Sequence, residues 1–234
     1  MDSQTKKKRG RARKRRGKLS LAEVQNALYI DFEGRTGCPP VLLGTLAAPA
    51  AGLSDVVQYV VDPVFAVTGA ATNCTVIALD ELVSALVDRA INEGRRIVAW
   101  SEHDLDVVRD HCSPATYQRF AARYRNARAF ADRWREQLHP HVVFDTPGRK
   151  ENALANYEDM IRYEVPERFG PGKTGEHLRR LIPPLTRGKI WDELSPAQRG
   201  YWDDVLGHNQ HDCVGMYEVC KRAASELDTK RDEI

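Results

Sequence analysis

Two acidic residues, Asp31 and Glu33, follow a short apolar run and stand two positions apart. In an extended chain, side chains at that spacing point to the same face. Two carboxylates held together on a buried strand repel each other and lose hydration, and a divalent cation would offset both effects. Oxygen ligands suit Mg²⁺ or Mn²⁺. The pair therefore indicates a metal site. The alternative is a turn at the end of the strand, with both acids in water.

A third acid, Asp104, follows an apolar run at 97–100 and a short polar turn that leads into an expected helix. The carboxyl ends of strands are where α/β folds place ligand sites. The alternative is helix capping, in which Ser101, Asp104 or Asp106 stabilises the first turn and does nothing else. This segment therefore contributes to a site only in combination with the others.

His208 and Asp212 form the last pair of interest. They stand four residues apart, so on a helix they share one face. The same face continues to Met216 and Val219, which are apolar, so the pair lies on or beside the buried side. A half-buried acid next to a half-buried histidine requires a partner. The alternative is a hydrogen bond between the two that stabilises the start of the helix.

The elements that must position these residues alternate between strands and helices. Apolar and β-branched runs predict five strands, at 27–31, 41–46, 55–61, 97–100 and 142–144. Helical spacing and helix-start signals predict helices at 79–92, 104–111, 113–138 and 154–163, and further helices from 174, from 195 and over 208–227. Gly207 is expected to interrupt the chain between the last two.

The order of these elements predicts an α/β fold. The first three strands follow one another without a helix, which favours an antiparallel meander, and the later strands are joined through helices. That is the order of a ribonuclease H-like fold, with a mixed five-stranded sheet flanked by helices on both faces. In such a fold the first strand, the end of the fourth strand and the last helix converge. The acids named above occupy these three places.

The conjunction of these motifs resembles the DEDD exonuclease superfamily (DnaQ-like, ribonuclease H-like fold). More narrowly, it is similar to the YprB-like branch of predicted nucleases. Residues 28–33 (Leu-Tyr-Ile-Asp-Phe-Glu) resemble the first motif of that branch, and 41–44 resemble the strand that follows it. Residues 100–104 resemble the second motif, whose last acid opens a helix, and 208–213 resemble the third. The likeness covers about residues 25–225.

The resemblance implies a nuclease domain over residues 21–234 that hydrolyses phosphodiester bonds of DNA or RNA from the 3′ end. Two ions, Mg²⁺ or Mn²⁺, would be held by four carboxylates, those of Asp31, Glu33, Asp104 and Asp212. His208 would be the catalytic base, although it stands four residues before Asp212, where the superfamily places Tyr. A partner nuclease or helicase is also implied.

The charge of the chain is distributed unevenly. The net charge is +2, but residues 1–20 hold ten of the 35 Lys and Arg residues and one of the 33 Asp and Glu residues. The remainder therefore has 25 basic and 32 acidic residues and a net charge of −7. We expect residues 1–20 to be a disordered basic tail that binds nucleic acid without reading its sequence. The tail residues assigned to this contact are Lys6, Lys7, Lys8, Arg9, Arg11 and Arg13. The alternatives are a solubility tail or a nuclear-localisation run.

Two aromatic residues beside the motifs, Phe32 and Trp100, are candidates to stack on terminal bases, and core packing is the alternative for both. The absence of a long apolar run excludes a membrane span, and we expect a cytoplasmic protein, or a nuclear one if eukaryotic. Five cysteines without a CxxC pair favour free thiols in a reducing compartment. A zinc site would have to use His139 with His141, or His208 and His211 with Cys213, and neither set has a usual structural-zinc spacing.

Two other functions remain open from the sequence. One is a non-catalytic nucleic-acid-binding module on the same fold, which would keep the basic tail but lack a working metal centre. The other is a structure-specific endonuclease that uses the same two-metal chemistry.

Overall fold

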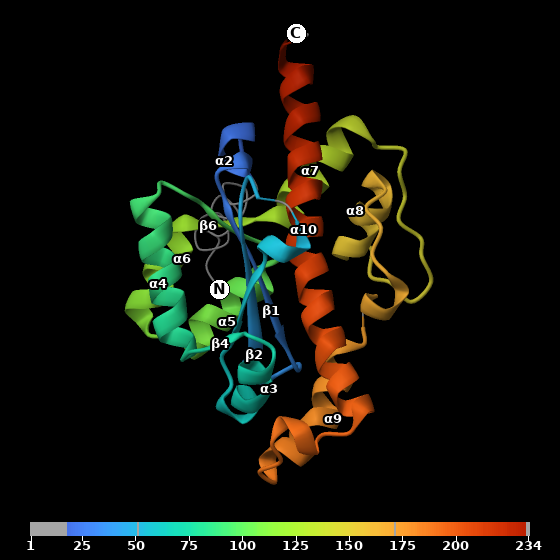
Figure 1. Ribbon diagram of the computed structural model, residues 1–234. Coiled ribbons are helices and arrows are strands. Elements are labelled where there is room, and N and C mark those ends of the chain that lie inside the picture. The colour runs from blue at the N-terminus through green and yellow to red at the C-terminus, as the bar shows by residue number, and fades with distance from the viewer. Residues whose placement is uncertain (1–17, 51, 171, 233–234) are drawn as a thin grey trace, which may run out of the picture.

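Six strands form one mixed sheet in the computed structural model, which describes residues 18–50, 52–170 and 172–232 (Figure 1). The strands stand in the order β4-β3-β2-β1-β5-β6. Their bounds are β1 Leu28–Gly34, β2 Pro40–Ala47, β3 Val57–Val60, β4 Thr75–Val76, β5 Ile97–Ala99 and β6 Tyr124–Asn126. β1, β2 and β3 are antiparallel neighbours, whereas β5 is parallel to β1 and β6 is parallel to β5. The chain is therefore an α/β protein, and the expected meander is confirmed. The expected count of five strands is wrong, because the short strand β4 also pairs with β3 in the described sheet.

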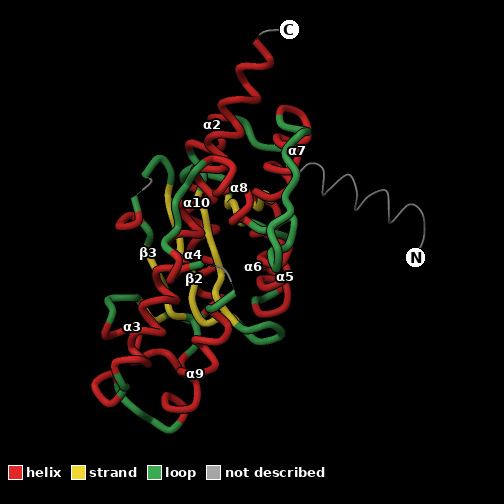
Figure 2. Tube along the Cα trace, turned by 90° about the vertical axis from the view of Figure 1, so that its right-hand side faces the viewer, coloured by secondary structure: helices red, strands yellow, loops and turns green. Residues whose placement is uncertain are grey.

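Helices cover both faces of this sheet. Their bounds are α2 Leu21–Gln25, α3 Ala66–Ala71, α4 Leu79–Asn92, α5 Glu102–His111, α6 Pro114–Arg123, α7 Ala127–Leu138, α8 Leu154–Ile161, α9 Thr174–Thr186 and α10 Pro196–Asp232. In Figure 1, α4, α5 and α6 lie on one side of the sheet, and α10 runs along the other side with α8 beyond it. Figures 1 and 2 both place α3 and α9 at the end of the molecule opposite the C-terminus.

The side chains of β1 alternate between two cores. Leu28 and Ile30 are buried in the core that includes α4, α5 and α6, and Phe32 packs against the same core. Tyr29 points the other way and packs among residues of α7, α8 and α10. Because successive strand residues face opposite sides, Asp31 and Glu33 lie on the α10 side. The period of the strand therefore aims both acids at the last helix.

The prediction of a fifth strand at 142–144 is wrong. That segment is irregular, and Val143 is 78% exposed, so its β-branched residues find no sheet edge to pair with. The strand that pairs with β5 is instead β6, in the middle of the helix expected over 113–138. Asn126 ends β6 and caps α7, since its side chain accepts a hydrogen bond from the Ala129 amide at 2.7 Å. The stretch 113–138 therefore forms α6, β6 and α7 instead of one helix.

The expected break at Gly207 is also absent, because α10 runs without interruption from Pro196 to Asp232. The glycine has a packing role in the helix. A Cβ at this position would collide with the ring of Phe169, which packs directly against the helix backbone. Gly207 therefore permits a close approach between the segment after α8 and the helix that carries His208.

The five cysteines are all free thiols, as expected. Within the described ranges, no helix has both the length and the apolar character needed to cross a membrane.

Candidate metal centre

Three of the predicted side chains meet where the end of β1 faces α10. The ligand atoms of Glu33, His208 and Asp212 all lie within 4.8 Å of one another. His208 Nε2 is 3.7 Å from Glu33 Oε1, and His208 Nδ1 is 3.7 Å from Asp212 Oδ1. At that distance the histidine and Asp212 form no direct hydrogen bond. The pair is therefore not simply a bond that stabilises the start of a helix.

The other two predicted acids lie within electrostatic range of this group. The pKa of Asp31 is raised well above its usual value, first by loss of hydration and then by the negative charges of Glu33, Asp212 and Asp104. The pKa of Glu33 is raised for the same reasons, and a hydrogen bond with Asp31 offsets part of the effect. Burial likewise raises the pKa of Asp104 and of Asp212. Four acids from three elements therefore repel one another at one place.

Asp104 has a second role at the start of α5. One of its carboxylate oxygens accepts hydrogen bonds from the Ser101 amide at 3.0 Å and from the Ser101 hydroxyl at 3.3 Å. Ser101 in turn caps the helix by accepting a bond from the His103 amide. This is a capping box, which the sequence offered as the alternative for this segment. The capping box also holds the Asp104 carboxylate in a fixed orientation, from which its negative charge raises the pKa of Asp31.

Asn209 holds Asp31 in place, although nothing in its spacing along the chain marks it as part of a site. Its side chain is fully buried, and Nδ2 donates to the Asp31 main-chain oxygen at 3.0 Å and to Asp31 Oδ2 at 2.9 Å. Its Oδ1 accepts a bond from Gln58 Nε2 at 2.9 Å. The carboxamide passes directly over Gly44 of β2, where a Cβ would collide with it. Asn209 is therefore a positioning residue for Asp31.

Replacing Gly44 with alanine is expected to lower the free energy of unfolding by about 1–3 kcal/mol, because the added methyl group overpacks the Asn209 site. Urea unfolding measures this change. Gly200→Ala is the matched control, since a Cβ at that helical position meets nothing within 4 Å. The control is expected to raise stability by roughly 0.5–1 kcal/mol. Equal stability of the wild type and the Gly44 variant would contradict the close packing of Asn209 on β2.

The ring of His208 is oriented by the segment after α8. Nδ1 lies 2.7 Å from the main-chain oxygen of Phe169, so Nδ1–H donates to that oxygen. In the neutral ring this leaves Nε2 without a proton, on the side of Glu33. Burial opposes the charged form of the ring, but the carboxylates of Asp212 and Asp31 outweigh it and raise the pKa of His208. The histidine is therefore placed to accept a proton.

Another carboxylate, that of Glu158 on α8, is buried beside the group. It is 3% exposed, and Oε1 has no hydrogen-bond partner among the described residues. Burial and the charge of Asp212 raise the pKa of Glu158 to about 9. A Cβ on Gly215 would collide with this carboxylate, so a glycine of α10 makes room for it. The sequence pattern that could have identified Glu158 is its position four residues after Leu154, which puts an acid on the apolar side of the expected helix.

The donor set fits a hard divalent cation. Carboxylate oxygens dominate it, and Mg²⁺ and Mn²⁺ prefer such ligands. The repulsion among the acids and the unpartnered Oε1 of Glu158 are both relieved by a positive charge at this place. The histidines of the alternative zinc sites have other partners. His139 Nε2 bonds to Glu226 at 2.7 Å, and the ring of His211 bonds to the Tyr163 hydroxyl at 3.1 Å.

The residues predicted to contact nucleic acid lie at different places relative to the acid group. Phe32 packs against the core beneath α4, α5 and α6, on the opposite face of β1 from the acids. Trp100 is half-buried and lines a hollow that reaches Asp212. The six tail residues from Lys6 to Arg13 lie outside the described residues. Among the aromatic candidates, Trp100 therefore lies beside the centre and Phe32 does not.

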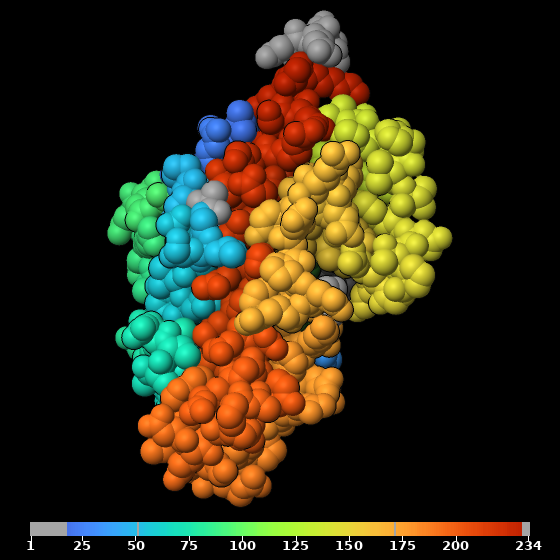
Figure 3. All heavy atoms as spheres, turned by 45° about the vertical axis from the view of Figure 1, so that its right-hand side comes forward, coloured from blue at the N-terminus to red at the C-terminus, as the bar shows by residue number. Residues whose placement is uncertain are grey.

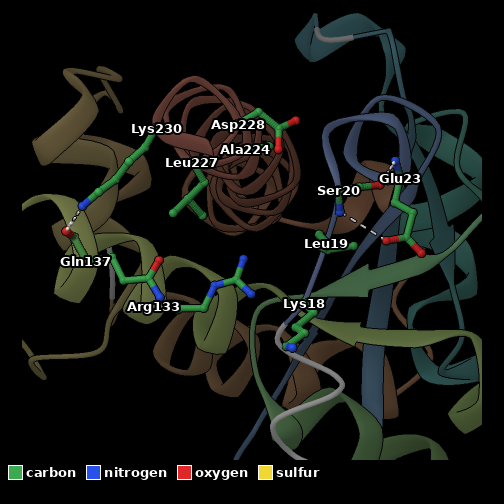
Figure 4. Close-up of a pocket in the computed structure, with 10 residues that line it drawn as sticks. All are labelled: Lys18, Leu19, Ser20, Glu23, Arg133, Gln137, Ala224, Leu227, Asp228 and Lys230. Atoms are coloured by element: carbon green, nitrogen blue, oxygen red, sulfur yellow. Dashed lines mark hydrogen bonds between the residues drawn. The ribbon is translucent and has the colours of Figure 1, made fainter. Parts of the chain in front are cut away.

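A separate pocket of about 410 Å³ lies between α2, α7 and the last turns of α10 (Figure 4). Lys18, Arg133 and Lys230 are among its lining residues, and Glu23 and Asp228 balance part of their charge. Of the described residues that line it, none belongs to the acid group on β1, α5 and α10. We therefore assign the candidate site to the acid group and not to this pocket.

Comparisons with known proteins add no assignment to this geometry. A scan of protein-family models, a search of curated proteins and a search of solved structures found no match to the chain. The support for a function consequently comes from the meeting of Glu33, His208 and Asp212, with Asp31 and Asp104 within electrostatic range of them.

Proposed function

We propose that this chain has a ribonuclease H-like fold and is a metal-dependent nuclease acting as a 3′–5′ exonuclease on DNA or RNA. The observation that carries the proposal is the convergence of four acids and a histidine from β1, α5 and α10. The antiparallel meander followed by β5 and β6, each reached through helices, supports the fold. The direction of digestion rests on the resemblance to the DEDD exonucleases.

In this proposal the protein supplies a preorganised group of carboxylate ligands. Asp31, Glu33, Asp104 and Asp212 would hold two divalent ions, Mg²⁺ or Mn²⁺. The bound ions would stabilise the negative charge that develops on the phosphate during hydrolysis. Two of the acids are held in place before any ion binds, since Asn209 fixes Asp31 and the capping box fixes Asp104. A site fixed in advance loses little free energy to reorganisation.

His208 would take the proton from the attacking water. Its Nδ1–H is bonded to the Phe169 oxygen, so Nε2 is the atom that accepts. The nearby carboxylates stabilise the imidazolium that results, because they raise the pKa of His208. The ring therefore combines a fixed orientation with a favourable environment for the protonated form.

The proposal is tested with two labelled substrates in Mn²⁺, a linear 5′-labelled single strand and a covalently closed circle. An exonuclease shortens the linear strand in steps and leaves the circle intact. Cleavage of the circle would indicate the endonuclease. Binding of both substrates without cleavage would indicate the non-catalytic module, for which the histidine at the Tyr spacing is the motivating observation.

The basic tail is expected to hold the substrate backbone without reading bases. Removing residues 1–18 should weaken binding and flatten its salt dependence, by roughly 0.7 in the slope of log K against log salt for each cation that contacts a phosphate of a single strand. Fluorescence anisotropy over a series of salt concentrations measures both. An unchanged slope would show that the tail plays no part in binding.

A further inference from the structure

A second hollow, of about 630 Å³, adjoins the acid group on the side of β5. Trp100 and Arg128 line it, together with residues 146–150 and 152–154. It shares Asp212 and Arg149 with the hollow of about 320 Å³ that contains His208 and Glu158. Figure 3 shows this side of the molecule, where segments 139–153 and 154–170 lie next to each other and the surface is hollowed between them.

The two hollows differ in charge. The one with His208 is lined by four acids and by Arg149; the acids are Glu158, Asp159, Glu167 and Asp212. The second is lined by three cations and by a single acid, Asp212; the cations are Arg128, Arg149 and Lys150. The two hollows meet at Asp212. The hollow that contains His208 is mainly acidic and suits metal ions, whereas the second hollow is mainly basic and suits phosphates.

Two of the three cations are available to a ligand. Within the part of the chain that the structure describes, Arg128 and Lys150 form hydrogen bonds only through main-chain atoms, and their side chains form no ion pair. Arg149 is engaged with Asp159 at 2.5 Å. The main-chain amide of Arg128, near the start of α7, donates to the main-chain oxygen of Trp100 at 2.9 Å, which holds the two residues together at the hollow.

Trp100 provides a fixed aromatic wall. Its Nε1–H donates to the Asn152 main-chain oxygen at 3.1 Å, and its ring packs edge-on against Tyr157 with centroids 5.4 Å apart. These contacts hold the indole in one orientation while it remains half-buried at the hollow. Proteins that bind single strands combine such an aromatic platform with a cationic groove.

We propose that this hollow binds the backbone of a single nucleic-acid strand next to the bond to be cleaved. Arg128 and Lys150 contact phosphates, and Trp100 stacks on a base. The proposal rests on the proposed nuclease function and deepens it, since it selects a single strand over a duplex as the substrate at this place. The strand lies over the cationic hollow and reaches the acids at Asp212.

The test measures binding of a fluorescent 12-nucleotide thymidine single strand to the full chain in millimolar Ca²⁺, with the recovered strand checked for length. The double variant Arg128→Ala with Lys150→Ala is expected to weaken binding about 10- to 100-fold and to reduce the salt slope by roughly 1.4, or 0.7 for each lost phosphate contact. The charge-conserving pair Arg128→Lys with Lys150→Arg should recover the slope. Trp100→Leu should weaken binding about 5- to 100-fold, the effect of one lost stacking contact.

The matched control is Arg109→Ala with Lys221→Ala, which removes the same charge from exposed ion pairs on α5 and α10. It should bind within about twofold of the wild type. Equal binding by the control and by the Arg128 and Lys150 variant would overturn this inference, while cleavage by the wild type in Mn²⁺ would leave the proposed function standing. Tighter binding of a duplex than of the single strand would also overturn it. A wild type that neither binds nor cleaves would overturn both.

Discussion

Replacing Asp31 with asparagine is expected to lower the rate of nucleic-acid cleavage at least about a thousandfold while leaving the fold intact. The amide has the shape of the carboxylate but no charge with which to hold a cation. A loss of about 4 kcal/mol in transition-state stabilisation corresponds to that factor. The fold should survive because the asparagine Oδ1 can still accept the bond from Asn209 Nδ2. Cleavage of a 5′-labelled strand measures the loss of activity, and circular dichroism measures whether the fold is retained.

The control for this experiment is Asp106→Asn on α5. Asp106 is two residues from Asp104, but its carboxylate is exposed and pairs with Arg109 at 2.5 Å. The same chemical change at this position should leave cleavage within about twofold of the wild type. Normal turnover in the Asp31 variant would refute the role of the acid group. An equal loss of cleavage in both variants would show that removing any negative charge in this region lowers activity, whether or not the acid belongs to the group.

Without metal, the protein is expected to lose stability as the pH rises from about 5 to 8. Loss of hydration and mutual repulsion raise the pKa of Asp31 and of Glu33, and the pKa of Glu158 reaches about 9. In this window the folded protein therefore holds protons that the unfolded chain has released, and stability falls with pH. The raised pKa of His208 acts in the same direction, because its stabilising charge is lost as the pH rises. Thermal melts in EDTA at pH 5.5 and 8 measure this difference.

Adding Mn²⁺ should reverse the loss at the higher pH. A ligand at 100 times its dissociation constant stabilises the folded state by about 2.7 kcal/mol. For a chain of this length, that corresponds to an increase in Tm of roughly 5–10 °C. The increase should be smaller at pH 5.5, where protons compete for the carboxylates. Asp106→Asn should retain the increase and Asp31→Asn should lose most of it. A Tm that millimolar Mn²⁺ leaves unmoved would count against the metal centre.

The sequence predicted best the elements whose pattern is local. The stripe of Leu82, Leu86 and Ala90 defines α4, which has the predicted bounds. The apolar run before Asp31 defines β1, and the period of two aims its acids to one face. β6 was missed because its residues Tyr124–Asn126 become a strand only by pairing with β5. Residues 142–144 show the opposite case: their side chains favour a strand, but no strand of the described chain lies beside them to pair with, so they remain irregular.

The residues that complete the site depend on contacts far along the chain. Asn209 stands next to His208, but its importance comes from Asp31 and Gln58, which lie 178 and 151 residues away. Glu158 reaches the group only because α8 packs on α10 at Gly215. Acids with a recognisable spacing could be found from the sequence. The polar residues that hold them could not, since their partners are set by the packing of β1, β2 and α10.

The measurement that tests the central claim most directly is the fate of a 5′-labelled single strand, DNA and RNA in parallel, incubated with the full chain in Mn²⁺ and in EDTA. We expect a ladder that shortens from the 3′ end in Mn²⁺ and an intact strand in EDTA. A strand that is bound but remains intact in Mn²⁺ would contradict the proposed nuclease and would indicate a binding module.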